Sequence, residues 1–286
     1  MKVYEIVTNT ILEELEQGNV PWRKPWKVNG DGIPKNYVSK RHYRGINALL
    51  LAVSGMAFTD SHWLTFNQVQ QLGGKVNKGE KGHLVVFWKM LKKAEVTASE
   101  EETGMEVEDK QIPYLRYYLV WNIDQTTLTK PDQAVTHFDP MEECERIVSD
   151  MPNPPEIQHW GNRAVYKLRD DKIILPKPEN FSNREEYYST KFHEVVHSTG
   201  HPKRLNRSSI LDYQPFGSPS YSEEELVAEI GCSFLCATTG ISPVTLSNSV
   251  AYIKGWLSTF KNDKKMIIRA AAKAQKAVDY ILSKES

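Results

Sequence analysis

The pentapeptide His193-Glu-Val-Val-His197 constrains this chain more than any other sequence feature. A helix start signal, Ser182-x-x-Glu185, precedes it, and Gly200 follows at a position typical of a helix end. An α-helix turns once in ~3.6 residues, so His193 and His197 project from one face, one turn apart. Two imidazoles at this spacing can bind the same Zn²⁺ ion. The sequence therefore predicts a helix that presents a metal site.

Glu194 gives this predicted metal site a chemical role. It directly follows the first histidine, from where it can reach a water molecule bound to the metal. Zinc lowers the pKa of such a water towards ~7, and a nearby carboxylate can take its proton and pass it to a leaving group. A metal that only stabilises a fold needs no carboxylate beside an open coordination position. Glu194 therefore favours a zinc-dependent hydrolase with Glu194 as the catalytic base.

A catalytic zinc ion needs a third protein ligand, and the sequence offers three candidates. His201 follows Gly200 directly, whereas the metzincin pattern has two more residues between that glycine and its third histidine. Glu225 and Glu229 stand one turn apart on a second helix, predicted to begin at Ser222. We favour Glu225 as the ligand, with Glu229 hydrogen-bonded to a ligand histidine. Ser222 and Glu225 also fit a capping box, which would occupy the Glu225 carboxylate and leave Glu229 as the ligand.

The N-terminal third of the chain is basic, although the whole chain has no net charge. Residues 1–94 contain fourteen Lys and Arg against seven Asp and Glu, whereas the full sequence has 36 of each class. Aromatic residues alternate with cations there, and rings stack on unpaired bases while cations contact phosphates. This pattern predicts binding of single-stranded DNA, although Trp22 and Trp26 also fit a hydrophobic core. The candidate DNA-binding residues are Trp22, Arg23, Lys24, Trp26, Lys35, Lys40, Arg41, Tyr43, Arg44, Lys75, Lys78 and Lys81.

Local patterns predict an α+β fold with two domains. In the first domain, residues 1–125, we expect three helices and a long hairpin with an acidic insertion at residues 95–109. In the second, residues 140–286, we expect a small hairpin among helices. The polar, proline-containing residues 126–139 predict a linker. The expected helices cover Val3 to Gly18, Ile46–Val53, Thr65 to Gly73, Ser182 to Thr199, 246–260 and 263–283, and two more are expected to begin at Asp139 and at Ser222. The expected strands are 84–88, 114–121, 164–168 and 172–175.

The remaining sequence features exclude several classes of protein. No apolar run is long enough to cross a bilayer, and the chain starts without the apolar segment of a secretory signal, so we expect a cytoplasmic protein with no membrane partner. The three cysteines, Cys144, Cys232 and Cys236, predict buried small side chains and no disulfide framework.

The chain resembles the ArdC-type antirestriction proteins of plasmids and mobile elements over nearly its whole length. The motifs that carry the resemblance are Pro21-Trp-x-x-Pro-Trp26, Tyr43-Arg-Gly-Ile-Asn47, Trp63-x-Thr-Phe-x-Gln68, Gly79-Glu-Lys-Gly82, His193-Glu-x-x-His197 with Gly200-His-x-x-Arg204, Glu224-Glu-Leu-Val-Ala-Glu229 and Tyr252-Ile-x-x-Trp256. The resemblance implies an N-terminal single-stranded-DNA-binding domain and a C-terminal zincin-like metallopeptidase domain. It also implies protection of incoming DNA from host restriction during transfer.

Together these observations predict Zn²⁺, or another divalent metal, on His193, His197 and Glu225, with single-stranded DNA and a protein substrate as partners. Two alternatives come from other classes of protein. One is an ordinary cytoplasmic zinc peptidase whose basic domain recruits its substrate. The other is a DNA-binding protein with a purely structural metal site.

Overall fold

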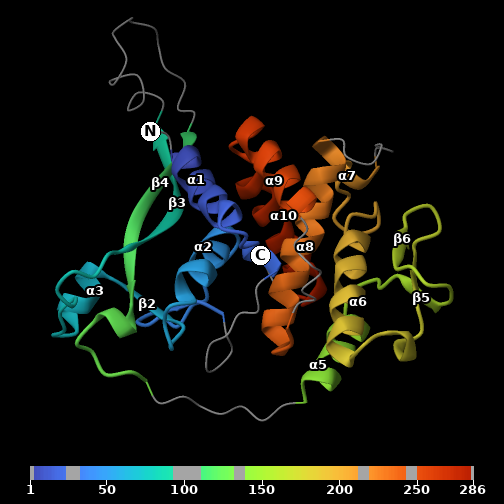
Figure 1. Cartoon of the computed structure of the whole chain (residues 1–286), viewed down its shortest axis with the longest axis horizontal. Helices are drawn as coiled ribbons and strands as arrows, with labels where there is room; N and C mark the ends of the chain where they lie inside the picture. The colour runs from blue at the N-terminus through green and yellow to red at the C-terminus, as the bar shows by residue number, and fades with distance from the viewer. Residues whose placement is uncertain are drawn as a thin grey trace, which may run out of the picture.

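The structure is a computed structural model that describes residues 3–23, 33–92, 111–131, 139–211, 219–242 and 250–284. A group of helices occupies the middle of the molecule, with one small sheet at each end (Figure 1). This mixed helix-and-sheet content confirms the predicted α+β class. The acidic insertion expected at residues 95–109 lies outside the described residues.

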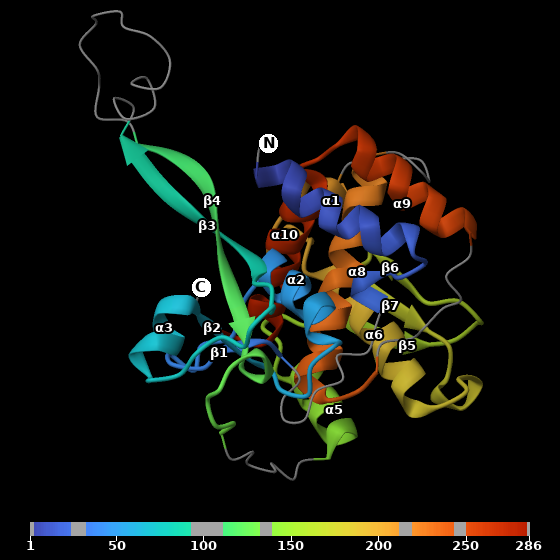
Figure 2. The same ribbon diagram turned by 60° about the vertical axis from the view of Figure 1, so that its left-hand side comes forward.

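The first half of the chain contains a four-stranded sheet with the order β1-β2-β4-β3. Strand β1 runs parallel to β2, and the other pairs are antiparallel. The expected hairpin is β3 and β4, in which Leu84 lies opposite Leu119, and Figure 2 shows it extending away from the helices. The elements are α1 (Val3–Glu16), η1 (Pro21–Arg23), β1 (Lys35–Asn36), α2 (Ile46–Gly55), β2 (His62–Thr65), α3 (Phe66–Gln71), β3 (His83–Lys92), β4 (Gln111–Asn122) and η2 (Ile123–Gln125).

The second half contains a three-stranded sheet with the order β5-β7-β6, in which β6 is an edge strand antiparallel to β7. Helices α6, α8 and α10 pack on one another beside it (Figure 1). The elements are α5 (Pro140–Ser149), β5 (Glu156–His159), β6 (Val165–Lys167), β7 (Lys172–Leu175), η3 (Pro178–Asn180), α6 (Arg184–Ser198), α7 (Ser208–Leu211), α8 (Pro219–Thr239), α9 (Val250–Asn262) and α10 (Met266–Ile281).

Several predicted helix ends are confirmed. Gly18 follows α1 with a φ of 83°, a conformation that glycine adopts without strain. Thr65 accepts the Gln68 N–H in a complete capping box at the start of α3. Asp139 caps α5 through the Met141 N–H, with Pro140 at the first helical position.

Two predicted helix starts are wrong, and one of them bears on the metal site. The cap of α6 is Asn183, which accepts the Glu186 N–H, rather than Ser182. Helix α8 begins at Pro219, so Ser222 lies inside the helix and cannot be its N-cap. The capping box that would have occupied the Glu225 carboxylate is therefore not formed.

The largest hydrophobic core joins the two halves of the chain. Ile11 and Leu15 of α1 and Leu49 of α2 are in the same buried cluster as Phe192 of α6 and Leu235 of α8. Two smaller clusters, built on Trp63 and Leu64, lie under the four-stranded sheet. Helices α1 and α2 thus pack with the helices of the second half, while the sheet keeps small cores of its own.

No helix in the described parts of the chain is long and apolar enough to cross a membrane. Cys144, Cys232 and Cys236 are all free and buried, as the sequence predicts.

Candidate metal centre and basic surface

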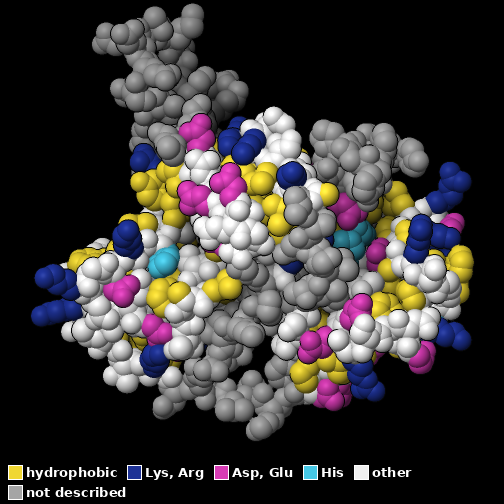
Figure 3. All heavy atoms as spheres, in the orientation of Figure 1, with side chains coloured by type: hydrophobic (Ala, Val, Ile, Leu, Met, Phe, Trp, Pro, Cys, Tyr) yellow, Lys and Arg dark blue, Asp and Glu magenta, His cyan; other side chains and the backbone are white. Residues whose placement is uncertain are grey.

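Helices α6 and α8 bring His193, His197 and Glu225 together. The Nε2 atoms of the two histidines are 3.1 Å apart. His193 Nε2 lies 3.5 Å from Glu225 Oε2, and His197 Nε2 lies 3.5 Å from Glu225 Oε1. Figure 3 shows histidine and acidic side chains next to one another at the surface over α6 and α8.

These separations fit one small divalent cation. Ligand atoms bound to zinc at ~2.0–2.1 Å in a tetrahedral arrangement lie ~3.4 Å from each other. The three measured separations, 3.1, 3.5 and 3.5 Å, bracket that value. The side chain of His193 is 25% exposed and that of Glu225 is 28% exposed, so the cluster is reachable from solvent on one side. Three protein ligands with an open side are what a catalytic metal requires.

The electrostatics of the cluster favour a cation. Burial alone would raise the pKa of Glu225, but hydrogen bonds from His193 and His197 outweigh it and hold the pKa below its usual range. Burial alone would lower the pKa of His197, but its contacts with Glu224 and Glu225 raise the pKa to about 10. The carboxylates therefore stay negatively charged and stabilise a proton on His197, which a metal cation would displace on binding the imidazole.

Glu224 contacts His197 from behind the ring, a contact that was not predicted from the sequence. Its Oε1 lies 3.3 Å from His197 Nδ1, on the opposite side of the ring from the cluster. Arg207 donates to both oxygens of Glu224, at 2.6 and 3.1 Å, and Ser209 donates to Oε2 at 2.6 Å. A carboxylate behind a ligand histidine fixes the ring and makes it more basic. Its position next to Glu225 was the only signal in the sequence.

Glu194 is buried beside the cluster and anchored to the edge strand β6. Its Oε2 accepts the backbone N–H of Tyr166 at 2.7 Å. This bond ties the helix that carries the histidines to the three-stranded sheet.

Glu229 lies elsewhere, contrary to the expectation that it supports a ligand histidine. Its carboxylate accepts the indole N–H of Trp22 at 2.5 Å and forms an ion pair with Arg23 at 2.8 Å. Tyr252 also donates to it. The carboxylate that contacts a histidine of the cluster, His197, is instead that of Glu224, one residue before Glu225. His201 is not part of the cluster of His193, His197 and Glu225. Its Nδ1 accepts the Lys203 N–H at 3.1 Å and lies 3.9 Å from Asp171 Oδ2.

The candidate DNA-binding residues are divided among several environments. Trp22 is 1% exposed and packs edge-on against Trp256 and Phe260, so the expectation that it stacks on a base is wrong. Arg23 is paired with Glu229. Lys24 and Trp26 lie outside the described residues.

The other candidates form two groups on the surface. Lys40, Arg41, Tyr43 and Arg44 line a pocket of about 510 Å³ against α8 and α10. Lys35 lies in β1 and is bridged to His42, which also lines this pocket. In this pocket Arg44 pairs with Asp279, and burial raises the pKa of Tyr43 to about 12. The second group, Lys75, Lys78 and Lys81, is exposed on the loop between α3 and β3.

Comparison with known families gives a match to each half of the chain. Residues 1–121 match the family described as the N-terminal domain of anti-restriction factor ArdC. Residues 142–273 match the family described as zincin-like metallopeptidase.

The similar proteins include both longer and equally long chains. An Escherichia coli protein named DNA primase TraC is 34% identical over an alignment of 297 positions, gaps included, which covers 99% of this chain but 27% of the primase. A second Escherichia coli TraC primase is 31% identical, and the match covers 20% of it. The chain thus spans about a quarter or less of these longer relatives. An uncharacterized Sinorhizobium fredii protein, y4eC, is 32% identical over 99% of this chain and 92% of its own length.

Two solved structures are similar to the whole chain. Both are crystal structures of the antirestriction ArdC protein from the R388 plasmid, at 33% identity. The metal-free structure has a TM-score of 0.78 and covers 98% of this chain and 97% of that one. The Mn(II)-bound structure has a TM-score of 0.77 and covers 99% and 98%.

Proposed function

The chain belongs to the family of ArdC antirestriction proteins, and from this membership we propose that it protects incoming DNA of a mobile element, binds single-stranded DNA and carries a zinc metallopeptidase site. The observation that carries the proposal is the cluster of His193, His197 and Glu225, whose ligand atoms lie within 4.8 Å of one another, with Glu194 next to His193 on α6. The donor set has the residue types and spacing of a catalytic metal site.

His193, His197 and Glu225 would hold the metal, and Glu224 would keep the His197 ring in place. A divalent metal bound there supplies a Lewis acid, which makes a water molecule nucleophilic near neutral pH. Glu194 would take the proton of the attacking water and return it to the leaving amine. The Tyr166 N–H fixes one oxygen of Glu194 at 2.7 Å, and we assign proton transfer to the other oxygen.

Zinc is the metal we propose, because two imidazoles and one carboxylate are a common ligand set for catalytic zinc. The same nitrogen and oxygen donors also accept other first-row divalent ions, and one similar structure is described as Mn(II)-bound. Elemental analysis of protein purified without added metal, together with competition between Zn²⁺ and Mn²⁺ for one site, distinguishes the two ions.

The DNA-binding part of the proposal is supported by the local charge of residues 1–94 and by the exposed lysines between α3 and β3. The test measures binding of the full chain to a labelled mixed-sequence oligonucleotide and to the matching duplex. We expect tighter binding to the single strand and an affinity that falls as salt rises. Equal affinity for both forms at moderate salt would mean that the basic region binds polyanions in general and has no preference for single strands.

Protection of DNA is tested in cells. A plasmid with sites for the recipient's restriction enzyme is transferred into cells that express this chain, its Glu194→Gln variant or neither. We expect the wild-type chain to raise the yield of transconjugants, and equal yields in all three would contradict the antirestriction proposal.

The two alternative functions predict other results. An ordinary peptidase with a recruiting domain would hydrolyse protein without preferring single-stranded DNA, whereas a protein with a structural metal site would hydrolyse nothing.

A further inference from the structure

Three large apolar side chains of the four-stranded sheet and one of α3 are exposed close together. Phe66, Phe87, Tyr118 and Leu119 are 46%, 42%, 37% and 41% exposed. Together with Thr65, Asn67 and Trp121 they line one open groove of about 810 Å³. Single exposed apolar residues are common, but a gathered group of them marks an interaction site.

The groove follows from the way the sheet ends. Strand β2 pairs with β4 only as far as Thr65 opposite Val120, and Thr65 then caps α3. The residues of β4 that come before Val120 have no neighbouring strand on the edge that faces β2, among the described residues. This leaves Tyr118 and Leu119 uncovered on that edge.

The aromatic rings of the groove form two pairs. Phe66 packs against Trp121 with ring centroids 5.8 Å apart, and Phe87 packs against Tyr118 at 5.7 Å. Each pair is tilted, at 59° and 58°, rather than edge-on or stacked. The rings are therefore supported by a neighbour while they remain partly open to solvent.

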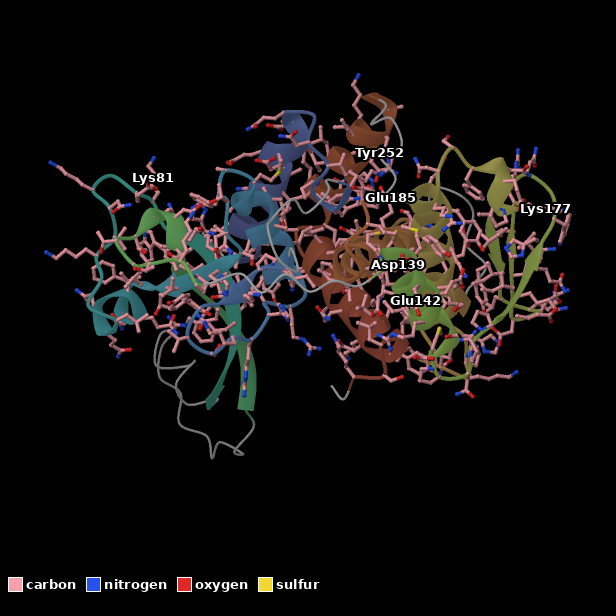
Figure 4. The ribbon with its side chains drawn as sticks, turned by 90° about the horizontal axis from the view of Figure 1, so that it is seen from below. Lys81, Asp139, Glu142, Lys177, Glu185 and Tyr252 are labelled. Carbon is pink, nitrogen blue, oxygen red and sulfur yellow. The ribbon has the colours of Figure 1, made fainter. Side chains whose placement is uncertain are left out.

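Positive charge adjoins the groove. The loop that carries Lys75, Lys78 and Lys81 ends at Gly82, where an added Cβ would come within 2.8 Å of Trp121 and 2.9 Å of Leu119. The loop and the groove are thus in direct contact. The one acidic residue of the loop, Glu80, accepts a hydrogen bond from Gln125 at 2.8 Å. Arg116 lies opposite Phe87 in the strand register. Figure 4 shows Lys81 at one end of the molecule, opposite the end that carries Lys177.

Exposed rings beside exposed lysines fit a single strand of nucleic acid better than a protein. Unpaired bases stack on aromatic side chains, and lysines contact the phosphates between them. A duplex keeps its bases in its own stack and offers only its backbone to such a surface. Protein interfaces are depleted in lysine, so a second copy of the chain or a protein partner would use the rings but not the three cations.

We propose that the groove formed by Phe66, Phe87, Tyr118, Leu119 and Trp121 is the base-stacking surface for single-stranded DNA. Lys75, Lys78 and Lys81 guide the phosphates past it. This inference rests on the proposed function and assigns the rings that serve it, in place of Trp22, which is buried. It also assigns the preference for single strands to stacking and the salt dependence to the loop.

The test uses the full chain and two fluorescent probes, oligothymidylate of ~12 nucleotides and an abasic strand of equal length. Phe66→Leu and Tyr118→Leu keep an apolar side chain but remove the ring. We expect each to weaken binding of oligothymidylate about tenfold, within the range for loss of one stacked base, and to leave the abasic strand unchanged. Tyr118→Phe keeps the ring and should bind as the wild type does.

Trp160→Ala is the matched control. Trp160 is 56% exposed with Lys167 above its ring, but it follows β5 at the opposite end of the molecule from α3 (Figure 1). Its loss should not change the affinity for either probe. Thermal unfolding of every variant checks that the fold is kept.

Three outcomes would overturn the inference, and each is recognisable. If the wild type binds oligothymidylate and both leucine variants bind it equally well, the bases stack elsewhere. If the variants lose both probes alike, the groove does not contact bases. If sedimentation shows that the leucine variants dissociate a wild-type dimer without changing DNA affinity, a second copy occupies the groove. A wild type that binds neither probe contradicts the proposed function itself.

Discussion

The indole N–H of Trp22 donates to the Glu229 carboxylate at 2.5 Å, and Glu229 stands one helical turn after Glu225 on α8. Arg23 pairs with the same carboxylate at 2.8 Å, and its guanidinium lies 3.8 Å above the Tyr252 ring. A segment of the first half of the chain therefore contacts the helix that carries the proposed third metal ligand. The two halves are joined both by hydrophobic packing and by this buried polar contact.

The first prediction concerns the two halves when they are separated. Residues 1–125 produced alone should unfold at a lower temperature than the full chain and bind a hydrophobic dye. The reason is that Ile11, Leu15, Trp22 and Leu49 lose the helices that bury them, at ~1.5–3 kcal/mol for each large side chain. Differential scanning calorimetry of the fragment and the full chain measures the effect. A fragment that unfolds cooperatively at the temperature of the full chain would contradict it.

The second prediction separates the roles of Glu225 and Glu229. Glu225→Ala should weaken metal binding more than about 100-fold, because loss of a ligand exceeds the ~10–100-fold loss expected for a residue that only supports one. Glu229→Ala should change metal affinity much less but destabilise the fold by ~3 kcal/mol, because it leaves the mostly buried Arg23 without its partner. Competition with a chelator gives the affinities, and denaturant unfolding gives the stabilities.

The reversed result has a clear meaning. If Glu229→Ala releases the metal and Glu225→Ala does not, then the cluster of His193, His197 and Glu225 is not the metal site. Glu229→Gln serves as a control, because it keeps an acceptor for the Trp22 N–H while removing the negative charge next to Arg23.

Local signals in the sequence predicted both hairpins and most of the helices of this fold, but not the strands β1, β2 and β5. The capping box at Thr65, the Asp139-Pro140 start of α5 and the histidines of α6 all depend on residues within one or two helical turns. Such signals act through backbone hydrogen bonds and helix periodicity, which the sequence displays directly. The α+β class follows from the same patterns.

Contacts between distant segments could not be predicted in this way. Glu223, Glu224 and Glu225 are consecutive on α8, and each points in a different direction around the helix. Glu223 pairs with Arg269 and Lys273 of α10, Glu224 contacts His197 and Arg207, and Glu225 faces the two histidines. Only the packing of α8 against α6 and α10 decides which glutamate receives which role. Burial of Trp22 has the same origin, because its partners Trp256 and Phe260 come more than two hundred residues later.

The third prediction tests Glu224 as the residue that orients His197. Glu224→Ala should weaken metal binding about 10–100-fold while His193, His197 and Glu225 stay in place. It should also lower stability, because Arg207, with a side chain that is 6% exposed, loses its carboxylate partner. Glu223→Ala is the matched control, since it removes a neighbouring glutamate that contacts α10 instead. Equal metal affinities for the two variants would show that Glu224 does not support the site.

The fourth prediction concerns the exposed lysines of the loop before β3. Replacing Lys75, Lys78 and Lys81 with alanine should weaken single-strand and duplex binding alike. The slope of log affinity against log salt concentration for the single strand should also become shallower by up to ~2, because each of the three lost phosphate contacts contributes ~0.7. Lys177→Ala, at the opposite end of the molecule in Figure 4, should leave the slope unchanged. An unaltered slope in the triple variant would mean that other cations contact the phosphates.

The last prediction concerns Glu194, the general base predicted from the sequence. Glu194→Gln should keep the fold, because the amide oxygen of glutamine can still accept the Tyr166 N–H that Glu194 accepts at 2.7 Å. It should also keep the metal, since the three proposed ligands are untouched. Hydrolysis of labelled casein by the zinc-loaded protein should fall by ~10²–10⁴-fold, because an amide cannot take the proton of the attacking water. A variant that binds zinc and hydrolyses as fast as the wild type would exclude Glu194 as the base, and a zinc-loaded wild type that cleaves no protein would contradict the peptidase proposal.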